Sequence, residues 1–432
     1  MRDNPYGLNT KRPSVMWIDL NSAFATAEQQ AHIPLRGRPV GITNRLSKEC
    51  CIIAASYEAK QLGVKVGSRR SEALAKCPNL IILESDPPKY HHVYKTLSSI
   101  MMDYTPYVKM KSIDEGVLNF HKTPFDQKTE ELIRIGYEIK KRVRQEIGDY
   151  MTINVGIGPN QFLAKTAANL HKPDGLDVID HTNLVEVYRS LELQDLNGIA
   201  DGYGSRLRAH NIFTPLQFLG ATEQTLKRNV FRSVNGSYWY RRLRGYEIDE
   251  GKSKTGMIGR QWVVGNPTND ETYLRSCLHY LAETTAKKLR FRNLEARGVC
   301  VWMSFSSGGS FVDKRMYKTT SYSNESIWER VTSLFDKRPS HMRVNVMGVY
   351  LYGLEPSNRA QLDLFGNVEK ENYLTEALDE INDLYGTFTI YSADTLEGTK
   401  HVTQKIPFGG TEYFNLLLGK KSTPEYRGVF KS

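Results

Sequence analysis

The chain has 432 residues, 40% of them hydrophobic, and a formal net charge of +10. This length suits two to four domains with ordinary hydrophobic cores, and the positive charge favours a polyanionic partner. No apolar run reaches the length of a transmembrane helix, the N-terminus lacks the apolar core of a signal peptide, and the five cysteines include no CxxC pair. These features argue against a membrane protein, a disulfide framework and structural zinc, and we expect a cytoplasmic protein.

The first part of the chain interleaves strand-like and helix-like segments. We expect strands near 14–20, 40–42, 51–56, 110–118 and 152–157, and helices near 22–31, 57–63, 90–104, 130–147 and 160–170. The helix at 130–147 is the clearest, because Leu132, Ile135 and Ile139 recur at helical spacing. A mixed domain of helices and sheet is therefore predicted for this region.

The second part of the chain is organised around its charge. A helical basic region is expected at about 183–250, a polar linker at 251–256, and a mixed segment with strands at 258–355. The net charge is +7 over residues 203–260, +6 over 285–320 and −3 from 356 to the end. Two basic blocks favour two modules that grip nucleic acid, although a single block of this kind is often only a solvated face. In the tail we expect a helix at 373–384 and a strand at 386–391.

Three carboxylates lie in apolar, strand-like surroundings. Asp114 and Glu115 lie between Ile113 and Val117, and Asp19 follows Ile18. A buried carboxylate is costly unless a cation meets it, so three on neighbouring strand ends would suit a divalent metal and phosphoryl chemistry. Neighbouring strand residues point to opposite faces, so Asp114 and Glu115 reach one site only at a strand end or a bend, which Gly116 would permit. The alternative is a surface hairpin.

The motifs resemble those of the Y family of DNA polymerases, of the bacterial Pol IV and UmuC kind. The resemblance covers about residues 14–355 and rests on five stretches in the order and spacing of the family: Ile18-Asp19-Leu20-Asn21, Ser56-Tyr57-Glu58-Ala59-Lys60, Ser112-Ile113-Asp114-Glu115, Gly156-Ile157-Gly158 with Asn160 and Lys165, and Lys172-Pro173-Asp174-Gly175.

The resemblance implies an α+β multidomain fold shaped like a right hand. Its parts would be a ferredoxin-like palm at 1–24 and 86–180, small fingers at 25–85, a helical thumb at 181–250, a linker at 251–257, an α/β little finger at 258–355 and a C-terminal tail at 356–432. The implied activity is error-prone translesion synthesis without proofreading, in DNA repair, mutagenesis and the SOS response to DNA damage. The alternatives are a DNA- and clamp-binding scaffold and another palm-type enzyme such as a nucleotide cyclase.

The resemblance also assigns roles at the reaction centre. Asp19, Asp114 and Glu115, with the main-chain carbonyl of Leu20, would hold two Mg²⁺ ions, for which Mn²⁺ can substitute. These ions would serve the transfer of a dNTP to a primer 3′-OH.

Four further residues fall at nucleotide-binding positions of the family. Tyr57, Lys60 and Lys172 would bind the triphosphate. Many members of the family have Arg at the position of Lys60, and the lysine matches the UmuC-type subgroup. Lysine offers a point charge instead of a bidentate fork. Phe24 would select deoxyribonucleotides by clashing with a 2′-OH. Outside the family pattern, Phe24 would be read as a core residue.

The DNA contacts implied by the resemblance lie in the thumb and the little finger. Residues 197–204 stand where the thumb carries a helix-hairpin-helix turn, so the expected contacts there are Gly202, Gly204 and Arg206. In the little finger they are Arg260, Lys287 and Arg290. Such contacts to primer–template DNA would be independent of sequence and sensitive to salt.

The pentapeptide Gln361-Leu362-Asp363-Leu364-Phe365 matches the bacterial sliding-clamp motif. Gln361 would anchor it by hydrogen bonds, while Leu362, Leu364 and Phe365 supply apolar contacts. The tail beyond it resembles that of UmuC-type polymerases, which leaves a UmuD-like accessory subunit open as a partner.

Overall fold

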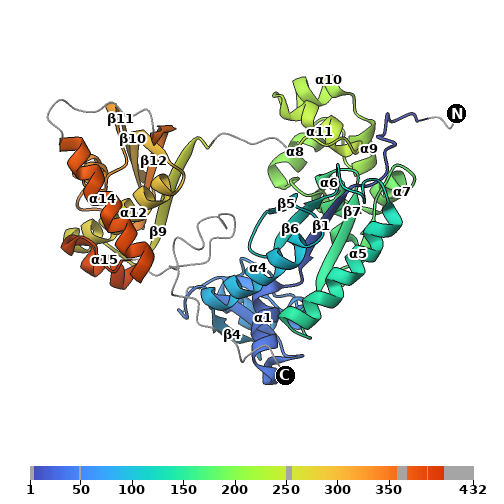
Figure 1. Ribbon diagram of the computed structural model, residues 1–432, viewed down its shortest axis with the longest axis horizontal. Coiled ribbons are helices and arrows are strands. Elements are labelled where there is room, and N and C mark those ends of the chain that lie inside the picture. Colours follow the sequence, from blue (N-terminus) through green and yellow to red (C-terminus); the bar gives the residue numbers. More distant parts are fainter. Residues whose placement is uncertain (1–3, 48–49, 250–254, 358–366, 387, 403–432) are drawn as a thin grey trace. The chain divides into compact units, whose positions relative to one another are not determined.

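The computed structural model describes the chain except residues 1–3, 48–49, 250–254, 358–366, 387 and 403–432. The described residues form two units, of which one precedes and one follows residues 250–254 in the chain (Figure 1). No described helix is long and apolar enough to cross a membrane. The five cysteines are free thiols.

A five-stranded sheet forms the centre of the first unit. Its strand order is β5-β6-β1-β7-β8, and all neighbours are antiparallel except β7 and β8. The strands are β5 (Val108–Met110), β6 (Glu115–Asn119), β1 (Val15–Leu20), β7 (Ile153–Gly158) and β8 (Leu176–Val178). Strand β1 lies in the middle and is buried along most of its length, which explains its unbroken apolar run.

Helices cover both faces of this sheet. Those that contact its strands are α4 (Pro87–Met102), α5 (Thr129–Arg142), which continues into the π-helical turn η2 (Val143–Ile147), and α6 (Gln161–Leu170). Helix α1 (Ala23–Ala31) packs on α4 and is followed by η1 (Ile33–Leu35). Helix α6 packs so closely on β7 that a Cβ at Gly156 would lie 2.0 Å from the carbonyl oxygen of Ala164, which only glycine permits. Val155 points to the other face and contacts α5 near Gly136. The expected helix at 130–147 is therefore present, but its last turn is π-helical.

A smaller sheet is inserted between α1 and α4. Its strand order is β3-β2-β4, with β3 antiparallel and β4 parallel to β2. The elements are β2 (Val40–Thr43), β3 (Ile52–Ala55), α2 (Tyr57–Gln61), α3 (Arg70–Lys76) and β4 (Ile81–Glu84). A core around Ile52, Ala59 and Leu80 joins the sheet to its helices, and Ser56 caps α2 by accepting from the Ala59 amide.

A helical region completes the first unit. It comprises α7 (Leu184–Ser190), η3 (Leu193–Asp195), α8 (Asp201–Arg208), α9 (Pro215–Gly220), α10 (Glu223–Thr225), η4 (Leu226–Val230) and α11 (Asn235–Leu243). Its aromatic core includes Phe218, Phe231 and Trp239, and Phe162 and Leu163 of α6 belong to the same core. The helical region is thus joined directly to the large sheet.

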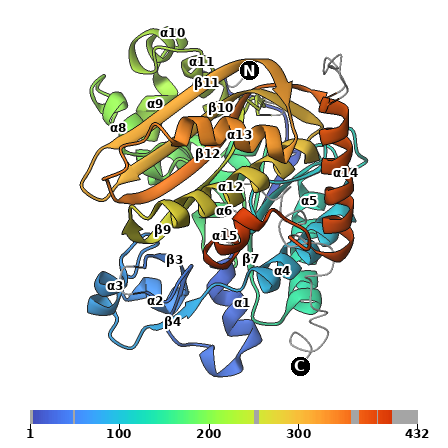
Figure 2. The same cartoon turned by 90° about the vertical axis from the view of Figure 1, so that its left-hand side faces the viewer.

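The second unit is a four-stranded antiparallel sheet with helices on one face. The strand order is β11-β10-β12-β9. The elements are β9 (Met257–Thr268), α12 (Glu271–Phe291), β10 (Leu294–Phe305), β11 (Ser310–Ser321), α13 (Asn324–Phe335), β12 (Val344–Pro356), α14 (Asn367–Tyr385), η6 (Ala393–Thr395) and α15 (Leu396–His401). Figure 2 shows α12 and α13 lying across the sheet, and α15 packs on α12.

The expected strand at 386–391 is wrong, because the described residues there form a turn. Asn382 satisfies both backbone groups of Ile390: its Nδ2 donates to the Ile390 carbonyl at 2.9 Å, and its Oδ1 accepts from the Ile390 amide at 3.0 Å. Phe388 stacks on Tyr280 of α12 with ring centroids 4.6 Å apart. The aromatic side chain of Phe388 therefore packs on a helix and not on a sheet edge.

Candidate active site

The strand ends of β1 and β6 bring the three predicted carboxylates together. Asp19 and Glu115 are direct cross-strand partners, and Asp114 precedes the first residue of β6. The Leu20 amide donates to the Asp114 carbonyl at 2.8 Å, which fixes this corner to β1. Asp114 and Glu115 can therefore both lie at one site, because β6 begins between them. Gly116 lies inside β6, where the side chains of Met101 and Met110 fill the space that a Cβ would need.

Glu115 and Asp114 have different partners. Lys165 Nζ donates to the two carboxylate oxygens of Glu115 at 2.8 and 3.0 Å, and Trp17 Nε1 donates to Oε2 at 3.2 Å. The Lys165 ammonium also lies 4.7 Å from the Trp17 ring centroid. Asp114 accepts a hydrogen bond from Ser112 Oγ at 2.5 Å. Glu115 is therefore held by a cation, whereas Asp114 is held by a neutral hydroxyl.

Burial and mutual repulsion make this corner attractive to cations. Burial raises the pKa of Asp19, and the nearby Glu115 charge raises it further, while Lys172 lowers it. Burial also raises the pKa of Asp114, and the charges of Asp19 and Glu115 add to the increase. Carboxylates that resist ionisation because they face one another are stabilised by a shared cation.

Lys172 reaches the same corner from the loop after α6. Its Nζ lies 3.0 Å from Asp19 Oδ2. Asn21 holds this loop in place: its Oδ1 accepts from the Asp174 amide and from Thr152 Oγ1, both at 2.9 Å, and its Nδ2 donates to Asn154 Oδ1 at 2.7 Å. Asn21 and Asn154 are both buried. Sequence reasoning assigned no role to Asn154, since nothing local distinguishes it from other strand polar residues.

Tyr57 and Lys60 lie on α2, close to the carboxylates. Lys60 Nζ donates to Ser22 Oγ at 2.7 Å and lies 4.7 Å from the Tyr57 ring centroid. Burial lowers the pKa of Lys60, and the charge of Lys172 lowers it further. Burial raises the pKa of Tyr57, as does the charge of Asp19. Lys60 and Lys172, which repel each other beside the Tyr57 hydroxyl, could therefore bind a polyanion.

Phe24 lies on α1 and is supported by a buried polar group. Its ring stacks on Tyr90 of α4, with centroids 4.4 Å apart and planes 14° apart. Tyr90 donates its hydroxyl to Glu28 Oε1 at 2.8 Å, and Lys89 Nζ pairs with Glu28 Oε2 at 2.6 Å. The side chains of Phe24, Glu28, Lys89 and Tyr90 are all buried. Sequence reasoning missed this set because Glu28 and Tyr90 are separated by 62 positions.

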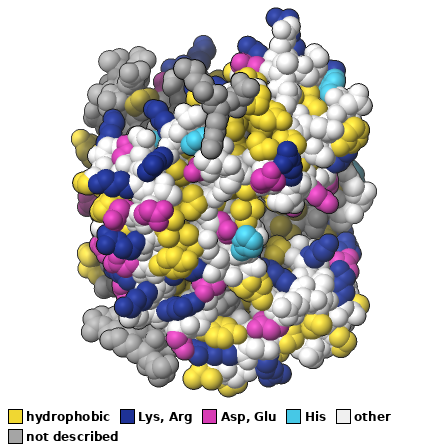
Figure 3. Space-filling model, turned by 90° about the vertical axis from the view of Figure 1, so that its right-hand side faces the viewer, with side chains coloured by type: hydrophobic (Ala, Val, Ile, Leu, Met, Phe, Trp, Pro, Cys, Tyr) yellow, Lys and Arg dark blue, Asp and Glu magenta, His cyan; other side chains and the backbone are white. Residues whose placement is uncertain are grey.

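The predicted thumb contacts lie at the start of α8. Gly202 is exposed with open space where a Cβ would be, Gly204 is buried beside the Arg208 guanidinium, and Arg206 is exposed and lies over the Tyr203 ring. Gly198, in the preceding turn, has a φ of +95°, which suits glycine alone. The face drawn in Figure 3 carries Lys and Arg side chains interspersed with Asp and Glu, so it forms no continuous basic patch among the described residues.

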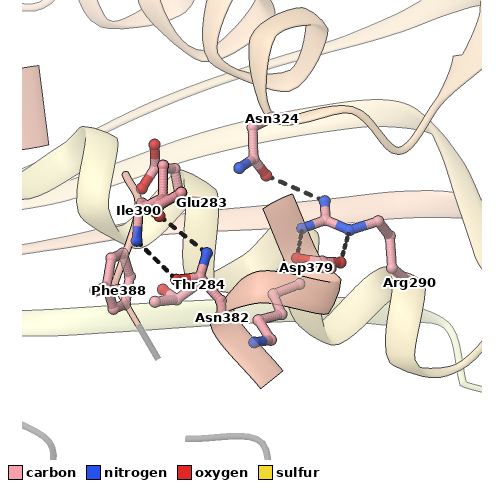
Figure 4. Close-up of a pocket in the computed structure, with 9 residues that line it drawn as sticks. Glu283, Thr284, Arg290, Asn324, Asp379, Asn382, Phe388 and Ile390 are labelled. Carbon is pink, nitrogen blue, oxygen red and sulfur yellow. Dashed lines mark hydrogen bonds and ion pairs between the residues drawn. The ribbon is translucent and has the colours of Figure 1, made fainter. Parts of the chain in front are cut away.

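The three basic residues predicted to contact DNA in the second unit lie on the helix side of the sheet. Arg290 donates from Nε and Nη2 to Asp379 of α14 at 2.5 and 2.9 Å, and from Nη1 to Asn324 Oδ1 at 3.1 Å (Figure 4). Lys287 pairs with Asp383 at 2.8 Å. Arg260 points to the opposite face of β9 from its exposed neighbour Gln261, and its guanidinium lies over the Tyr280 ring of α12. The structure does not bring these side chains to a common open surface.

Within the described ranges, no three or more His, Cys, Asp or Glu side chains are grouped as a metal site. At the carboxylate corner the reason is visible, since Glu115 is turned toward Lys165 and Asp19 toward Lys172. The donor set nevertheless fits hard divalent cations, because it consists of carboxylate oxygens and a neighbouring backbone carbonyl. The predicted clamp motif at 361–365 lies outside the described residues.

Two family models match the chain. The impB/mucB/samB family matches residues 18–169, and the impB/mucB/samB family C-terminal domain matches residues 257–364. A DNA polymerase IV of Moorella thermoacetica is 30% identical over 410 residues, which cover 89% of this chain and 96% of the relative. DNA polymerase IV 1 of Bacillus subtilis is 25% identical over 407 residues, covering 91% and 96%.

Solved structures show the same fold. A Y-family DNA polymerase chimera of Dbh and Dpo4 matches with a TM-score of 0.65 and 22% identity, over 78% of this chain and 98% of that chain. An insertion ternary complex of Dbh DNA polymerase matches with a TM-score of 0.57, also at 22% identity and over the same shares. The predicted α+β multidomain fold is thereby confirmed.

Proposed function

The chain belongs to the Y family of DNA polymerases and is a translesion DNA polymerase, and from this premise we propose that Asp19, Asp114 and Glu115 form its metal-dependent reaction centre. The observation that carries the proposal is the register of β1 and β6, which makes Asp19 and Glu115 cross-strand partners with Asp114 beside them. The enzyme is DNA-directed, its partners include DNA and dNTP, and its family uses divalent metal ions.

The three carboxylates and the Leu20 carbonyl would hold two Mg²⁺ ions, with Mn²⁺ as a substitute. When bound, such ions lower the pKa of the attacking 3′-OH and neutralise charge on the triphosphate and the leaving pyrophosphate. The chain itself supplies the acceptor oxygens and the scaffold. Because burial and repulsion raise the pKa of Asp19 and of Asp114, the ionised pair gains most from added positive charge.

Lys60, Lys172 and Tyr57 would bind the triphosphate. Lys60 and Lys172 both lie near Asp19, and their ammonium groups repel each other. An anion between them would offset this repulsion. Lys172 pairs with Asp19, so one ammonium group would be shared between this carboxylate and a phosphate. Phe24 would exclude ribonucleotides, and Tyr90 fixes the plane of its ring.

The domain assignment follows from the family and remains a proposal. The five-stranded sheet would be the palm (1–24 and 86–180), the small sheet the fingers (25–85), and the helical region the thumb (181–250). The second unit would contain the little finger (258–355), reached through a linker at 251–257, and the tail would occupy 356–432, whose helices α14 and α15 lie in the same unit. Gly202, Gly204 and Arg206 would approach DNA phosphates, whereas Lys287 and Arg290 are engaged with α14 and would need to leave Asp383 and Asp379 to do so.

The motif at 361–365 would recruit the bacterial sliding clamp through Gln361, Leu362, Leu364 and Phe365, and a UmuD-like subunit would be a further partner of the tail. SOS regulation is proposed on the same family grounds. The second candidate function is a scaffold for DNA and clamp in a mutagenic repair complex. The retention of all three carboxylates favours the enzyme.

Primer extension tests the reaction centre. Purified full-length protein with Mg²⁺ is expected to extend a primer on undamaged and abasic templates. Asp114→Ala should lower the rate at least about 100-fold, because an electrostatic stabiliser of this kind is worth roughly 3 kcal/mol of barrier. Glu84→Ala, at an exposed carboxylate at the end of β4, is the matched control and should keep the rate. Full activity of Asp114→Ala would reject the assignment.

A further inference from the structure

Helix α14 packs on the second unit through polar side chains. Asp379 pairs with Arg290 and Asp383 with Lys287, and both cations belong to α12. Thr375, on the same side of the helix, is only 5% exposed. The remaining polar contacts of this side are those of Glu371 with Ser323, of Glu376 with Tyr322 and of Asn382 with the backbone of Ile390. Hydrogen bonds and ion pairs therefore hold this side of the helix on its unit.

The opposite side of α14 is apolar. Its members, which we call the outer stripe, are Tyr373, Leu374, Ala377, Ile381 and Leu384. They recur at spacings of three and four residues, so they lie along one side of the helix. Tyr373, Leu374 and Leu384 are 70%, 58% and 60% exposed. A helix on a protein surface ordinarily turns its apolar side inward, so the reversed orientation of α14 marks the outer stripe as a surface for association.

Two exposed charges make the outer stripe complementary to a reversed copy of itself. Lys370 lies one helical turn before the first residues of the stripe, and Glu380 lies one turn before its last residue, Leu384. In an antiparallel pair of α14 helices with Ala377 opposite Ala377, Lys370 of one helix would lie opposite Leu384 of the other and within one turn of its Glu380. The small side chain at the centre would allow the helices to approach closely, and their dipoles would oppose each other.

We propose that the outer stripe binds the outer stripe of a second copy of this chain, in an antiparallel helix pair with two-fold symmetry. A two-fold interface uses the same surface twice, so the contact of Lys370 with Glu380 occurs twice. One helix side from each copy makes a small interface, and the dimer should be weak, with a Kd of roughly 10–100 µM. The proposal is independent of the proposed function, because it concerns the second unit in the absence of DNA and nucleotide.

Sedimentation equilibrium tests the pairing. Full-length protein free of nucleic acid is measured from about 1 to 200 µM, a range that brackets the expected Kd. Ala377→Glu places two carboxylates against each other at the centre of the pair, and glutamate is a good helix former. Lys370→Glu and Glu380→Lys each replace an attraction by a repulsion, whereas their combination restores the attraction. Lys141→Glu, at an exposed lysine of α5, is the matched control.

We expect the parent and Lys141→Glu to approach the mass of a dimer at the highest concentrations, and Ala377→Glu to stay monomeric with an unchanged circular dichroism spectrum. Each single charge reversal should raise the Kd about tenfold, and the combined variant should lie within about threefold of the parent. A monomeric parent, a dimer that Ala377→Glu leaves intact, or a combined variant no tighter than the single ones would each overturn the proposal. So would a parent that dimerises only after residues 403–432 are removed, because that segment would then be the occupant of the outer stripe.

Discussion

Tyr90 should determine how well Phe24 discriminates between sugars. Its ring stacks on Phe24 at 4.4 Å, and its hydroxyl donates to the buried Glu28. Tyr90→Leu removes the stack, and an aromatic pair of this kind is worth roughly 0.5–1.5 kcal/mol beyond area burial. If that energy holds the Phe24 ring in the plane where it meets a 2′-OH, its loss should raise the relative incorporation of ribonucleotides by about 2- to 12-fold.

Tyr90→Phe separates the ring from the hydroxyl. It keeps the stack but removes a hydrogen bond to a charged acceptor, so stability should fall by roughly 1.5–3 kcal/mol while sugar selection stays the same. Single-nucleotide insertion of a dNTP and the matching ribonucleotide measures the ratio of kcat/KM, with Phe24→Ala as the upper limit of the effect. The reasoning is refuted if Tyr90→Leu leaves the ratio unchanged while Phe24→Ala raises it, or if Tyr90→Phe and Tyr90→Leu raise it equally.

Three further predictions concern a buried carboxyl, a buried ion pair and the tail. Burial raises the pKa of Glu283 from its ordinary 4.5 to about 7, so its contribution favours folding below pH 4.5 and is lost as the pH rises to 7. Relative to Glu283→Gln, the parent should lose about 3 kcal/mol of unfolding free energy between pH 4.5 and 7, measured by urea titration. A difference between the two proteins that stays constant with pH would contradict this. Lys89→Met leaves the buried Glu28 carboxylate without its cation and should lower the local unfolding free energy of α1 and α4 by roughly 3–5 kcal/mol in hydrogen exchange, with partial recovery when Glu28→Gln is added. Alanine at Leu364 and Phe365 should abolish the stimulation of synthesis by sliding clamp and spare basal synthesis, and equal loss of both would count against the motif.

The sequence was sufficient to predict the carboxylate corner because its signals are local. Apolar neighbours mark β1 and β6 as buried strands, and a carboxylate inside such a strand needs a cation. The resemblance of the motifs then implied the fold, whereas the register that makes Asp19 and Glu115 cross-strand partners is seen only in the structure. The bend that lets Asp114 and Glu115 share a site was expected, although it lies before Glu115 and not at Gly116.

The sequence did not predict which cations pair with which carboxylates, because the two members of each pair are distant in the chain. Lys165 meets Glu115 across 50 positions, and Arg290 meets Asp379 across 89. Both pairings depend on how helices pack on sheets, which periodicity does not determine. The expected strand at 386–391 was wrong for the same reason, since Phe388 stacks on Tyr280 of α12 and the side chain of Asn382 bonds the backbone of Ile390.

The lysines explain how the chain can tolerate three carboxylates in one corner, because two of the three meet a cation from the chain itself. Lys165 and Lys172 each pair with one carboxylate, whereas Asp114 accepts from the neutral Ser112 hydroxyl. The two lysines differ in what they can do next. Lys165 is held by Glu115 and by the face of Trp17, whereas Lys172 lies on a loop that Asn21 anchors through the backbone and not through the lysine itself. We therefore propose that Lys172 can exchange its carboxylate for a phosphate without any change in the backbone of its loop, so that it would be the cation that responds to a bound triphosphate.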